Sequence, residues 1–350
     1  MNRRRVRQRS AAAENMKKIL NDPAGYTDDM LRGIYAAHPD AVCCAGGDLR
    51  CYCKKAPVEG KVAIVTGGGT GHLPLFLGYV GENLLDGCAV GSVFQSPGAE
   101  QIFAVSQAVE QGAGVLYLYG NYTGDTMNFD MAAELCELEG IETRSIVGAD
   151  DVCSAPRGRE DVRRGVAGIF FMYKCAGAKA AQMGSLDEVL AAAQKAKDST
   201  RTVGFALSPC VIPEVGHANF TLDEGEMAMG MGIHGEPGVW NGPVRTAKEL
   251  AESSVEAIMA DMPFTGEAAL LVNGLGATSL EELYILCGEA IKALSNQGVT
   301  VARTFVGEFA TSMEMAGASI SVMRVDSETK QWLDMPVSTP FFAYNSCCGQ

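Results

Sequence analysis

The stretch KVAIVTGGGTGH at residues 61–72 joins a short apolar run to a glycine-rich segment that ends in a histidine. Residues 61–66 have the pattern of a buried strand, and we expect GGGTGH (67–72) to end it in a loop. The chain contains no GxxxxGK[ST], and G-x-G-x-x-G needs glycine where His72 stands, so the usual nucleotide-binding loops are excluded. The loop offers bare backbone and one imidazole to a small oxygen-rich ligand, or it is a structural glycine turn.

Strand and helix patterns alternate along the first half of the chain. Strand patterns occupy residues 114–121 and 142–151, and helix patterns occupy residues 127–140, 163–184 and 186–198. This alternation predicts an α/β domain in which helices cover a parallel sheet. Before it, we expect a helical segment at 16–38 with a break at Pro23–Gly25, and an irregular segment at 39–60.

The second half mixes strand types, which favours a second, α+β domain. Expected strands cover residues 202–210, 226–233, 267–277, 299–309 and 318–326, and expected helices cover 248–262 and 279–298. Ser279 and Glu282 have the spacing of a capping box at the start of the last helix. We place the domain junction within 185–201. The expected divisions are a disordered extension at 1–15, the N-terminal α/β domain at 16–198 and the C-terminal α+β domain at 199–350.

Charge and composition limit the possible partners. Lys and Arg number 28 against 42 Asp and Glu, so the net charge is 28 − 42 = −14, with a pI near 4.8. This charge argues against a nucleic acid or an anionic membrane as a partner. No apolar run reaches the roughly 18 residues of a membrane span, and the Arg-rich amino terminus lacks the apolar core of a secretory signal. We therefore expect a cytoplasmic protein.

The twelve cysteines include no CxxC pair. Cys43, Cys44, Cys51 and Cys53 could form a soft-metal cluster, but their spacing is not that of a zinc ribbon or finger. We favour the alternative that they are small buried apolar side chains or exposed thiols, and we expect no metal site.

Two further glycine-rich motifs carry candidate functional side chains. NYTGD (121–125) ends a strand, so it shares a crevice with the first glycine loop if both strands belong to one parallel sheet. Asp125 is then a candidate general base, or alternatively a solvated turn residue. GIHGEPG (232–238) holds His234 between glycines, which give an imidazole little side-chain cover, so core packing is a poor explanation for it.

Six sequence blocks, taken in order, resemble one known family. They are VTGGGTGHLP, GNYTGDTMNFDMA, RRGVAG, GMGIHGEPG, LVNGLGATSLEELY and WLDMPVSTP. The chain resembles the dihydroxyacetone-binding (DhaK-type) subunit of bacterial dihydroxyacetone kinase from residue 16 to residue 340. The resemblance implies a phosphotransferase, the substrate-binding subunit of a glycerone kinase.

The resemblance also implies roles for particular residues. His234 would attack the ketone carbonyl and hold it as a hemiaminal, and His72 and Asp125 would act with it as catalytic residues. Gly69, Thr70 and Gly71 would line the ligand with them. An uncharged imidazole nitrogen adds to a ketone but not to an alcohol carbon, so such a site would accept a short ketose and exclude glycerol.

The implied partners lie outside this chain. No cofactor is expected on it, and ADP or ATP with Mg²⁺ is expected on a separate kinase subunit. A phosphocarrier of the phosphotransferase system and a homodimer are further expectations. Two alternatives stay open. Some relatives are ketone-sensing transcriptional coregulators. The second alternative is a kinase subunit whose substrate is a four-carbon ketose such as erythrulose. It stays open because Leu73 and Gly120 stand where the family often has glutamate and lysine.

Overall fold

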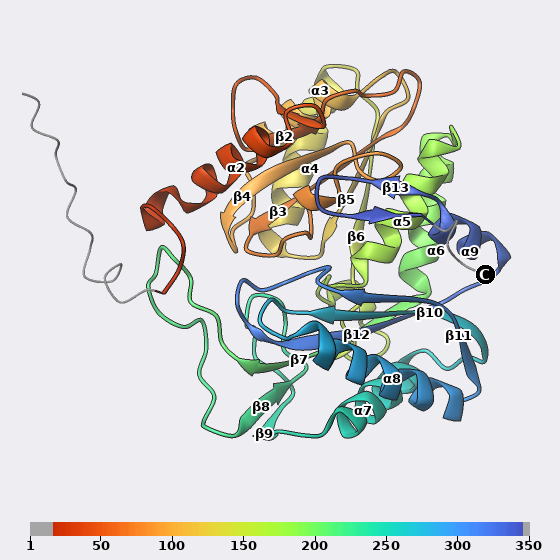
Figure 1. Ribbon diagram of the computed structural model, residues 1–350. Helices are drawn as coiled ribbons and strands as arrows, with labels where there is room; N and C mark the ends of the chain where they lie inside the picture. Colours follow the sequence, from red (N-terminus) through yellow and green to blue (C-terminus); the bar gives the residue numbers. More distant parts are fainter. Residues whose placement is uncertain (1–16, 346–350) are drawn as a thin grey trace, which may run out of the picture.

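The computed structural model describes residues 17–345, so the expected extension at 1–15 lies outside the described residues. Over the described range the chain forms two six-stranded sheets and one two-stranded sheet. Figure 1 shows the first sheet and its helices in the upper half of the molecule and the second sheet with its helices below. Within that range, no helix is both long enough and apolar enough to cross a bilayer.

The first sheet has the strand order β1-β2-β4-β3-β5-β6. Its strands are β1 (Val42–Cys44), β2 (Cys51–Lys54), β3 (Ala63–Thr70), β4 (Gly87–Val93), β5 (Val115–Gly120) and β6 (Thr143–Gly148). The last four pair in parallel, which confirms the predicted parallel sheet, whereas β1 and β2 form an antiparallel edge. The expectation of an irregular segment at 39–60 is wrong, because β2 pairs with β4, a strand that the sequence analysis did not identify.

Strand β3 continues through the glycines, so the prediction that residues 67–72 form the loop is wrong. A Cβ at Gly68 would lie 2.3 Å from the ring of Phe76, so only glycine lets this ring pack on the strand. The chain turns at Gly71, whose φ of +105° lies in the region that glycine favours. This turn places His72 just beyond the end of the strand.

Helices cover both faces of the first sheet. They are α3 (Ala99–Val109) and α4 (Thr123–Leu138) on one face, and α5 (Ile169–Ala181) and α6 (Leu186–Asp198) on the other. Along β5, Tyr117 and Tyr119 pack with α3 and α4, whereas Leu116 and Leu118 pack with the opposite layer. This alternation follows from the two-residue repeat of a strand that is buried on both sides. The helical segment before the sheet is a 3-10 turn at Pro23–Gly25 followed directly by α2 (Tyr26–Ala37). The expected helix over 16–38 is therefore confirmed only from Pro23 onward, because the described residues before it are not helical.

The second sheet has the order β11-β10-β12-β7-β8-β9. Its strands are β7 (Thr200–Ser208), β8 (Glu226–Met229), β9 (Trp240–Pro243), β10 (Gly266–Gly274), β11 (Val299–Gly307) and β12 (Ala316–Arg324). Only β10 and β11 pair in parallel, which agrees with the expected α+β class. The expected strand at 226–233 is too long, because the backbone leaves the extended region at Gly230, where φ is +79°.

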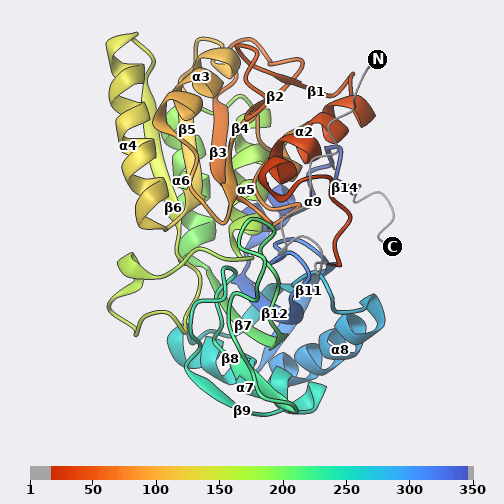
Figure 2. The ribbon, with the colours of Figure 1, turned by 90° about the vertical axis from the view of Figure 1, so that its left-hand side faces the viewer.

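Helices α7 (Ala247–Asp261) and α8 (Leu280–Asn296) lie on the side of the second sheet that faces away from the first, as Figures 1 and 2 both show. The predicted capping box is present, since Ser279 Oγ accepts from the Glu282 amide at 3.4 Å and Glu282 Oε2 accepts from the Ser279 amide at 3.0 Å. The other face of the sheet, which includes Leu271 and Phe305, joins the core of the first half.

The end of the described chain returns to the first half. It comprises α9 (Ser327–Asp334), β13 (Val337–Ser338) and β14 (Ala343–Tyr344), none of which the sequence analysis identified. The Glu82 amide donates to the Ser338 carbonyl at 2.8 Å, and Lys174 Nζ donates to the Met335 carbonyl at 2.6 Å. The two halves therefore share one hydrophobic core, and the carboxyl-terminal segment crosses back to contact the first half. The division into domains at residue 198 stays a prediction.

A buried ion pair joins the two halves and yields a stability prediction. Arg163 is fully buried and donates from both terminal nitrogens to Asp261 of α7, at 2.9 and 2.5 Å. Arg163→Met should lower the free energy of unfolding by about 3 kcal/mol. The reason is that the enclosed carboxylate of Asp261 loses an arginine that neutralises its charge. Urea denaturation followed by circular dichroism measures the change.

The matched control is Arg144→Met, since Arg144 is partly exposed and pairs with the exposed carboxylates of Glu142 at 2.8 Å and Asp187 at 3.5 Å. Exposed ion pairs contribute little, so this variant should stay within about 0.5 kcal/mol of the wild type. Equal losses in the two variants would contradict the assigned importance of the buried pair.

Candidate functional site

Three of the residues singled out in the sequence come from separate elements. His72 follows the turn after β3, Asp125 lies in the first turn of α4, and His234 lies in the loop after β8. The ring centroids of His72 and His234 are 4.7 Å apart, and the ring planes cross at 78°. The structure thus brings the two imidazoles together from opposite halves of the chain.

His72 is buried and its tautomer follows from its one hydrogen bond. Its Nδ1 lies 2.8 Å from the carbonyl oxygen of Thr311, so Nδ1 must carry the proton and donate it. Burial, together with the nearby charge of His234, lowers the pKa of His72 to about 3. The ring is therefore uncharged at neutral pH. Its Nε2 has a free lone pair and no hydrogen-bond partner.

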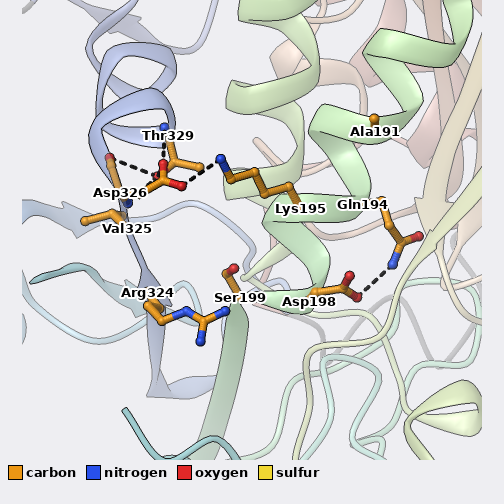
Figure 3. A pocket seen from close by; sticks show the side chains of 9 residues that line it. All are labelled: Ala191, Gln194, Lys195, Asp198, Ser199, Arg324, Val325, Asp326 and Thr329. Carbon is orange, nitrogen blue, oxygen red and sulfur yellow. Dashed lines mark hydrogen bonds and ion pairs between the residues drawn. The ribbon is translucent and has the colours of Figure 1, made fainter. Parts of the chain in front are cut away.

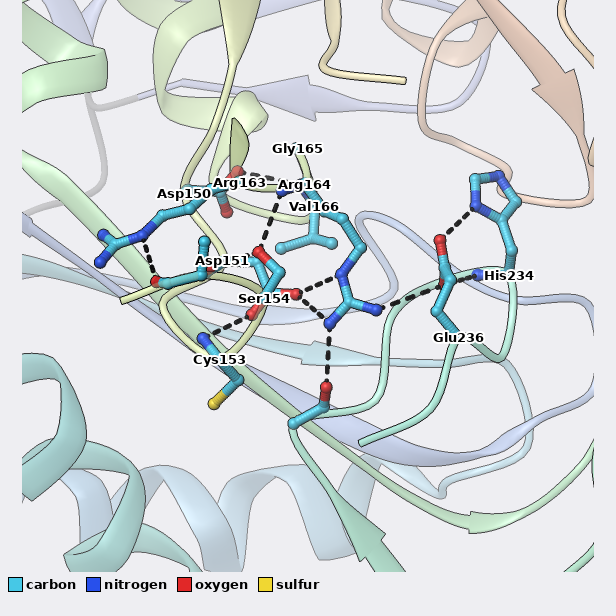
Figure 4. A network of polar contacts seen from close by, with 12 residues as sticks. Asp150, Asp151, Cys153, Ser154, Arg163, Arg164, Gly165, Val166, His234 and Glu236 are labelled. Carbon is cyan, nitrogen blue, oxygen red and sulfur yellow. Dashed lines mark hydrogen bonds and ion pairs between the residues drawn. The ribbon is translucent and has the colours of Figure 1, made fainter. Parts of the chain in front are cut away.

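His234 is oriented by the glutamate two residues further on. Nδ1 donates to Glu236 Oε1 at 2.9 Å, and the His234 amide donates to Oε2 at 3.0 Å (Figure 4). Burial raises the pKa of Glu236, but the hydrogen bond and charge of His234 outweigh it and bring the value to about 2. Because the carboxylate stays ionised, it holds a proton on Nδ1, and in the uncharged form of the ring the lone pair therefore lies on Nε2.

Aromatic rings surround the pair of imidazoles. Phe94 stacks on His72 with a centroid distance of 4.8 Å and an interplanar angle of 17°. The rings of Phe94 and Tyr122 meet His234 edge-on at 5.3 and 4.7 Å. These contacts restrict ring rotation and limit the access of water to the nitrogens.

Asp125 lies inside a helix and not in a solvated turn, so NYTGD is a loop only up to Tyr122. Its side chain is buried, and Oδ1 has no hydrogen-bond partner. Burial raises the pKa of Asp125 to about 6, although a hydrogen bond with Ser96 and the charge of His234 act in the opposite direction. An unpartnered buried carboxylate oxygen and a pKa near neutrality are suited to accepting a proton from a bound hydroxyl.

The predicted lining residues of the glycine segment are held by other parts of the protein. Thr70 Oγ1 lies 3.1 Å from Thr27 Oγ1, within hydrogen-bond distance. The carbonyl of Gly71 accepts from the Met313 amide at 2.7 Å, and a Cβ at Gly69 would lie 2.6 Å from the Gln95 amide nitrogen. Contact of Gly69, Thr70 and Gly71 with a ligand stays a prediction.

Sequence reasoning missed several residues of the site. Glu236 had a usable signal, because it lies in the same glycine-flanked motif as His234. Phe94 and Thr311 had none, since only the tertiary fold brings them to His72, in the latter case across 239 positions.

Gly120 and Leu73, the two departures from the family pattern, both lie beside site residues. A Cβ at Gly120 would lie 3.0 Å from the ring of Tyr122, so this ring occupies the neighbouring space. The Leu73 carbonyl accepts from Thr311 Oγ1 at 2.9 Å.

A separate polar hollow of about 600 Å³ lies between α6 and α9 (Figure 3). Lys195 lies 2.7 Å from Asp326 and 2.7 Å from Glu328, so its charge is already compensated. None of the residues singled out in the sequence line this hollow, and we place the functional site at the imidazoles.

The clustered cysteines lie in the β1–β2 hairpin, where Cys43 is directly opposite Cys53. Cys51 and Cys53 are buried in the core that packs on α3, which agrees with the apolar alternative. Within residues 17–345, no group of three or more His, Cys, Asp or Glu side chains is placed to hold a metal ion.

Fold and site together define a two-sheet α/β protein with two adjacent imidazoles between its halves. The family model of the Dak1 domain matches residues 32–341, and the chain belongs to this family. A dihydroxyacetone-binding subunit DhaK of a PTS-dependent dihydroxyacetone kinase from Listeria innocua is 41% identical over 93% of this chain and 99% of its own length. The predicted family is therefore confirmed.

Longer relatives match as well. The D-erythrulose kinase of Mycolicibacterium smegmatis is 43% identical over 93% of this chain, which spans 56% of that kinase. Among solved structures, the dihydroxyacetone kinase operon co-activator DhaQ has a TM-score of 0.84 at 30% identity, covering 91% of this chain and 98% of its own. The dihydroxyacetone kinase of C. freundii has a TM-score of 0.85 at 28% identity, covering 94% of this chain and 60% of its own.

The raised pKa of Asp125 predicts how stability depends on pH. The folded chain binds this proton more tightly than the unfolded chain, since its pKa is about 6 against the usual 3.8. The resulting stability is complete below pH 3.8 and is lost as the pH rises through 6. Asp125→Asn removes this loss, so the variant should be more stable than the wild type at pH 8 by up to about 3 kcal/mol.

Urea denaturation of both proteins at pH 4 and pH 8 checks the sign. The advantage of the variant should shrink towards pH 4, where the wild-type carboxyl is protonated when folded. An advantage of equal size at both pH values would show that ionisation of Asp125 is not its cause.

Proposed function

We propose that this chain is the ketose-binding part of a dihydroxyacetone-kinase-type phosphotransferase and holds the ketose covalently on His234. The observation that carries the proposal is the fixed tautomer of His234, whose Nδ1 donates to Glu236 at 2.9 Å. A free Nε2 lone pair is the group that adds to a carbonyl carbon. The family membership supports the same conclusion, because relatives named as dihydroxyacetone-binding subunits match almost their full length.

The covalent step conserves protons. As Nε2 bonds to the carbonyl carbon, the π electrons move to oxygen, which takes up one proton. The imidazole gives up its Nδ1 proton through its hydrogen-bond acceptor Glu236, and solvent relays that proton to the carbonyl oxygen, so that Glu236 ends as the carboxylate. The product is a neutral hemiaminal. Because glycerol has no carbonyl, it cannot form this bond, and a covalent tether compensates for the small apolar area of a three-carbon ligand.

The pKa values of His72 and Asp125 indicate which of the two accepts a proton from the ketose. His72, with a pKa of about 3, is a weak base, and its unpartnered Nε2 is suited to accepting a hydrogen bond from a ligand hydroxyl. Asp125, with a pKa of about 6, is the better proton acceptor at neutral pH. We therefore assign to Asp125 the removal of the proton from the terminal hydroxyl as the phosphoryl group arrives.

The phosphoryl donor is assigned to another domain or subunit. A relative from C. freundii is described in complex with AMP-PNP and Mg²⁺, and this chain covers 61% of that protein. We extend the same chemistry to this chain, with ADP or ATP and Mg²⁺ on a nucleotide-bearing partner. A phosphocarrier, a homodimer and a cytoplasmic location complete the proposal.

A second candidate function is ketone sensing without catalysis. It is favoured by the likeness to the DhaQ co-activator, which extends over 98% of that protein. A sensor needs the covalent anchor but no general base. Asp125 therefore distinguishes the two functions, because catalysis needs its carboxylate as a proton acceptor and sensing does not.

Asp125→Asn should reduce turnover by roughly 10²-fold or more and leave ketose binding nearly unchanged, because an amide cannot accept the hydroxyl proton. Turnover is measured with a nucleotide-bearing kinase subunit present, and binding is measured by calorimetry with dihydroxyacetone. His234→Ala is the comparison and should lose both. Wild-type turnover in Asp125→Asn would remove the general-base role and favour the sensor.

The ketose preference should be modest. Erythrulose kinases are among the relatives, at 43% and 39% identity. The Tyr122 ring fills the space beside Gly120, so the expectation rests on the relatives, which include kinases of both ketoses. We expect kcat/KM for erythrulose within about tenfold of that for dihydroxyacetone. Parallel assays with both ketoses decide the matter. A preference for dihydroxyacetone far above ~10²-fold would exclude the four-carbon substrate.

A further inference from the structure

The segment RRGVAG at 163–168 has no role in the site as described so far, yet its second arginine lies against the His234 loop (Figure 4). Arg164 Nε donates to Asp151 Oδ2 at 2.9 Å, and Nη2 donates to the Gly230 carbonyl at 3.0 Å. The remaining nitrogen, Nη1, lies 3.9 Å from Glu236 Oε2. The guanidinium therefore extends from the end of the first sheet to the carboxylate that orients the imidazole.

In the His234 loop, the Arg164–Glu236 ion pair fills the space that a side chain at Gly232 would need. A Cβ at Gly232 would lie 2.2 Å from Glu236 Oε2 and 2.7 Å from Arg164 Nη1. The carboxylate and the guanidinium thus occupy the space over the first glycine of the GIHGEPG motif. Any side chain at this position would displace them from each other.

We infer that Arg164 is a positioning residue, which holds the Glu236 carboxylate on Nδ1 of His234 so that Nε2 faces the ketone. This inference rests on the proposed function. Both oxygens of Glu236 are engaged by His234, one by the ring and one by the amide, and the arginine lies beside the second. A partly buried carboxylate with a cation nearby stays charged and keeps a fixed orientation.

Arg164 is itself fixed by the first half of the chain. Its partner Asp151 accepts from the Cys153 amide at 3.0 Å, and the Arg164 amide donates to Ser154 Oγ at 3.0 Å. The next residue, Gly165, accepts from the Tyr122 hydroxyl at 3.1 Å, and the Tyr122 ring packs against His234. The same short segment therefore supports His234 from two sides.

A double-mutant cycle tests whether Arg164 acts through Glu236. The readout is the tetrahedral adduct of [2-¹³C]dihydroxyacetone, observed by ¹³C NMR and titrated on the full chain. Arg164→Met and Glu236→Gln should each weaken adduct formation by about tenfold or more. The double variant should be no weaker than Glu236→Gln alone, because the arginine has nothing left to hold.

Two outcomes would overturn the inference. One is Arg164→Met binding within twofold of the wild type. The other is a double variant in which the two losses multiply, which would mean that Arg164 only joins the halves of the chain. If Arg164→Met does not fold, Arg164→Gln carries the same expectations, because it removes the charge and keeps an amide donor for Gly230 and Asp151.

The wild type and one control separate this inference from the proposed function. Absence of any tetrahedral signal in the wild type would refute the covalent ketose site itself. Arg159→Met is the matched control, because Arg159 is an exposed arginine that shortly precedes this segment and whose ion pair with Asp161 measures 3.8 Å. Its adduct affinity should equal that of the wild type. A loss as large as that of Arg164→Met would refute a specific role for Arg164.

Discussion

The hydrogen bond from His234 Nδ1 to Glu236 decides which nitrogen of this imidazole is available to a ligand. Since the carboxylate remains ionised, the uncharged ring keeps its lone pair on Nε2. His72 follows the same rule with the Thr311 carbonyl as the acceptor. Two histidines that would otherwise be interchangeable thus receive different tasks. In the proposed function, the partly exposed His234 is the nucleophile, and the buried His72 is a hydrogen-bond acceptor whose basicity burial has reduced.

The site depends on the packing of two sheets. His72 comes from the end of β3 and His234 from the loop after β8. His72 is held by the distant Thr311 carbonyl, whereas His234 is held by Glu236 of its own loop and by Asn219. The carbonyl of His234 also accepts from Asn219 at 3.0 Å, which holds its loop from the far side. The inner face of the second sheet joins the core of the first half, and this shared packing brings the two imidazoles together. Such support is what a covalent ketose anchor needs to align its reacting atoms.

Much of the fold could be predicted from residue patterns, and the failures have physical causes. Strand β5 and helix α8 were found because apolar spacing and a capping box are local signals. The β1–β2 hairpin was missed because cysteine and glycine give no clear period. The glycines of β3 looked like a loop, whereas Gly68 provides space for the Phe76 ring. His72, Asp125 and His234 were located through their motifs, but Thr311 and Arg164 reach the site only through tertiary contacts that no spacing reveals.

The central claim is that the ketose is carried covalently on His234, and a crystal structure of the chain with dihydroxyacetone tests it most directly. The account predicts continuous electron density from His234 Nε2 to a tetrahedral carbonyl carbon, with the Nδ1 contact to Glu236 preserved. It also predicts a terminal hydroxyl of the ketose at Asp125 Oδ1, the buried oxygen that has no other partner. A planar ketone at van der Waals distance from the ring, or a ketose bound elsewhere, would contradict the account.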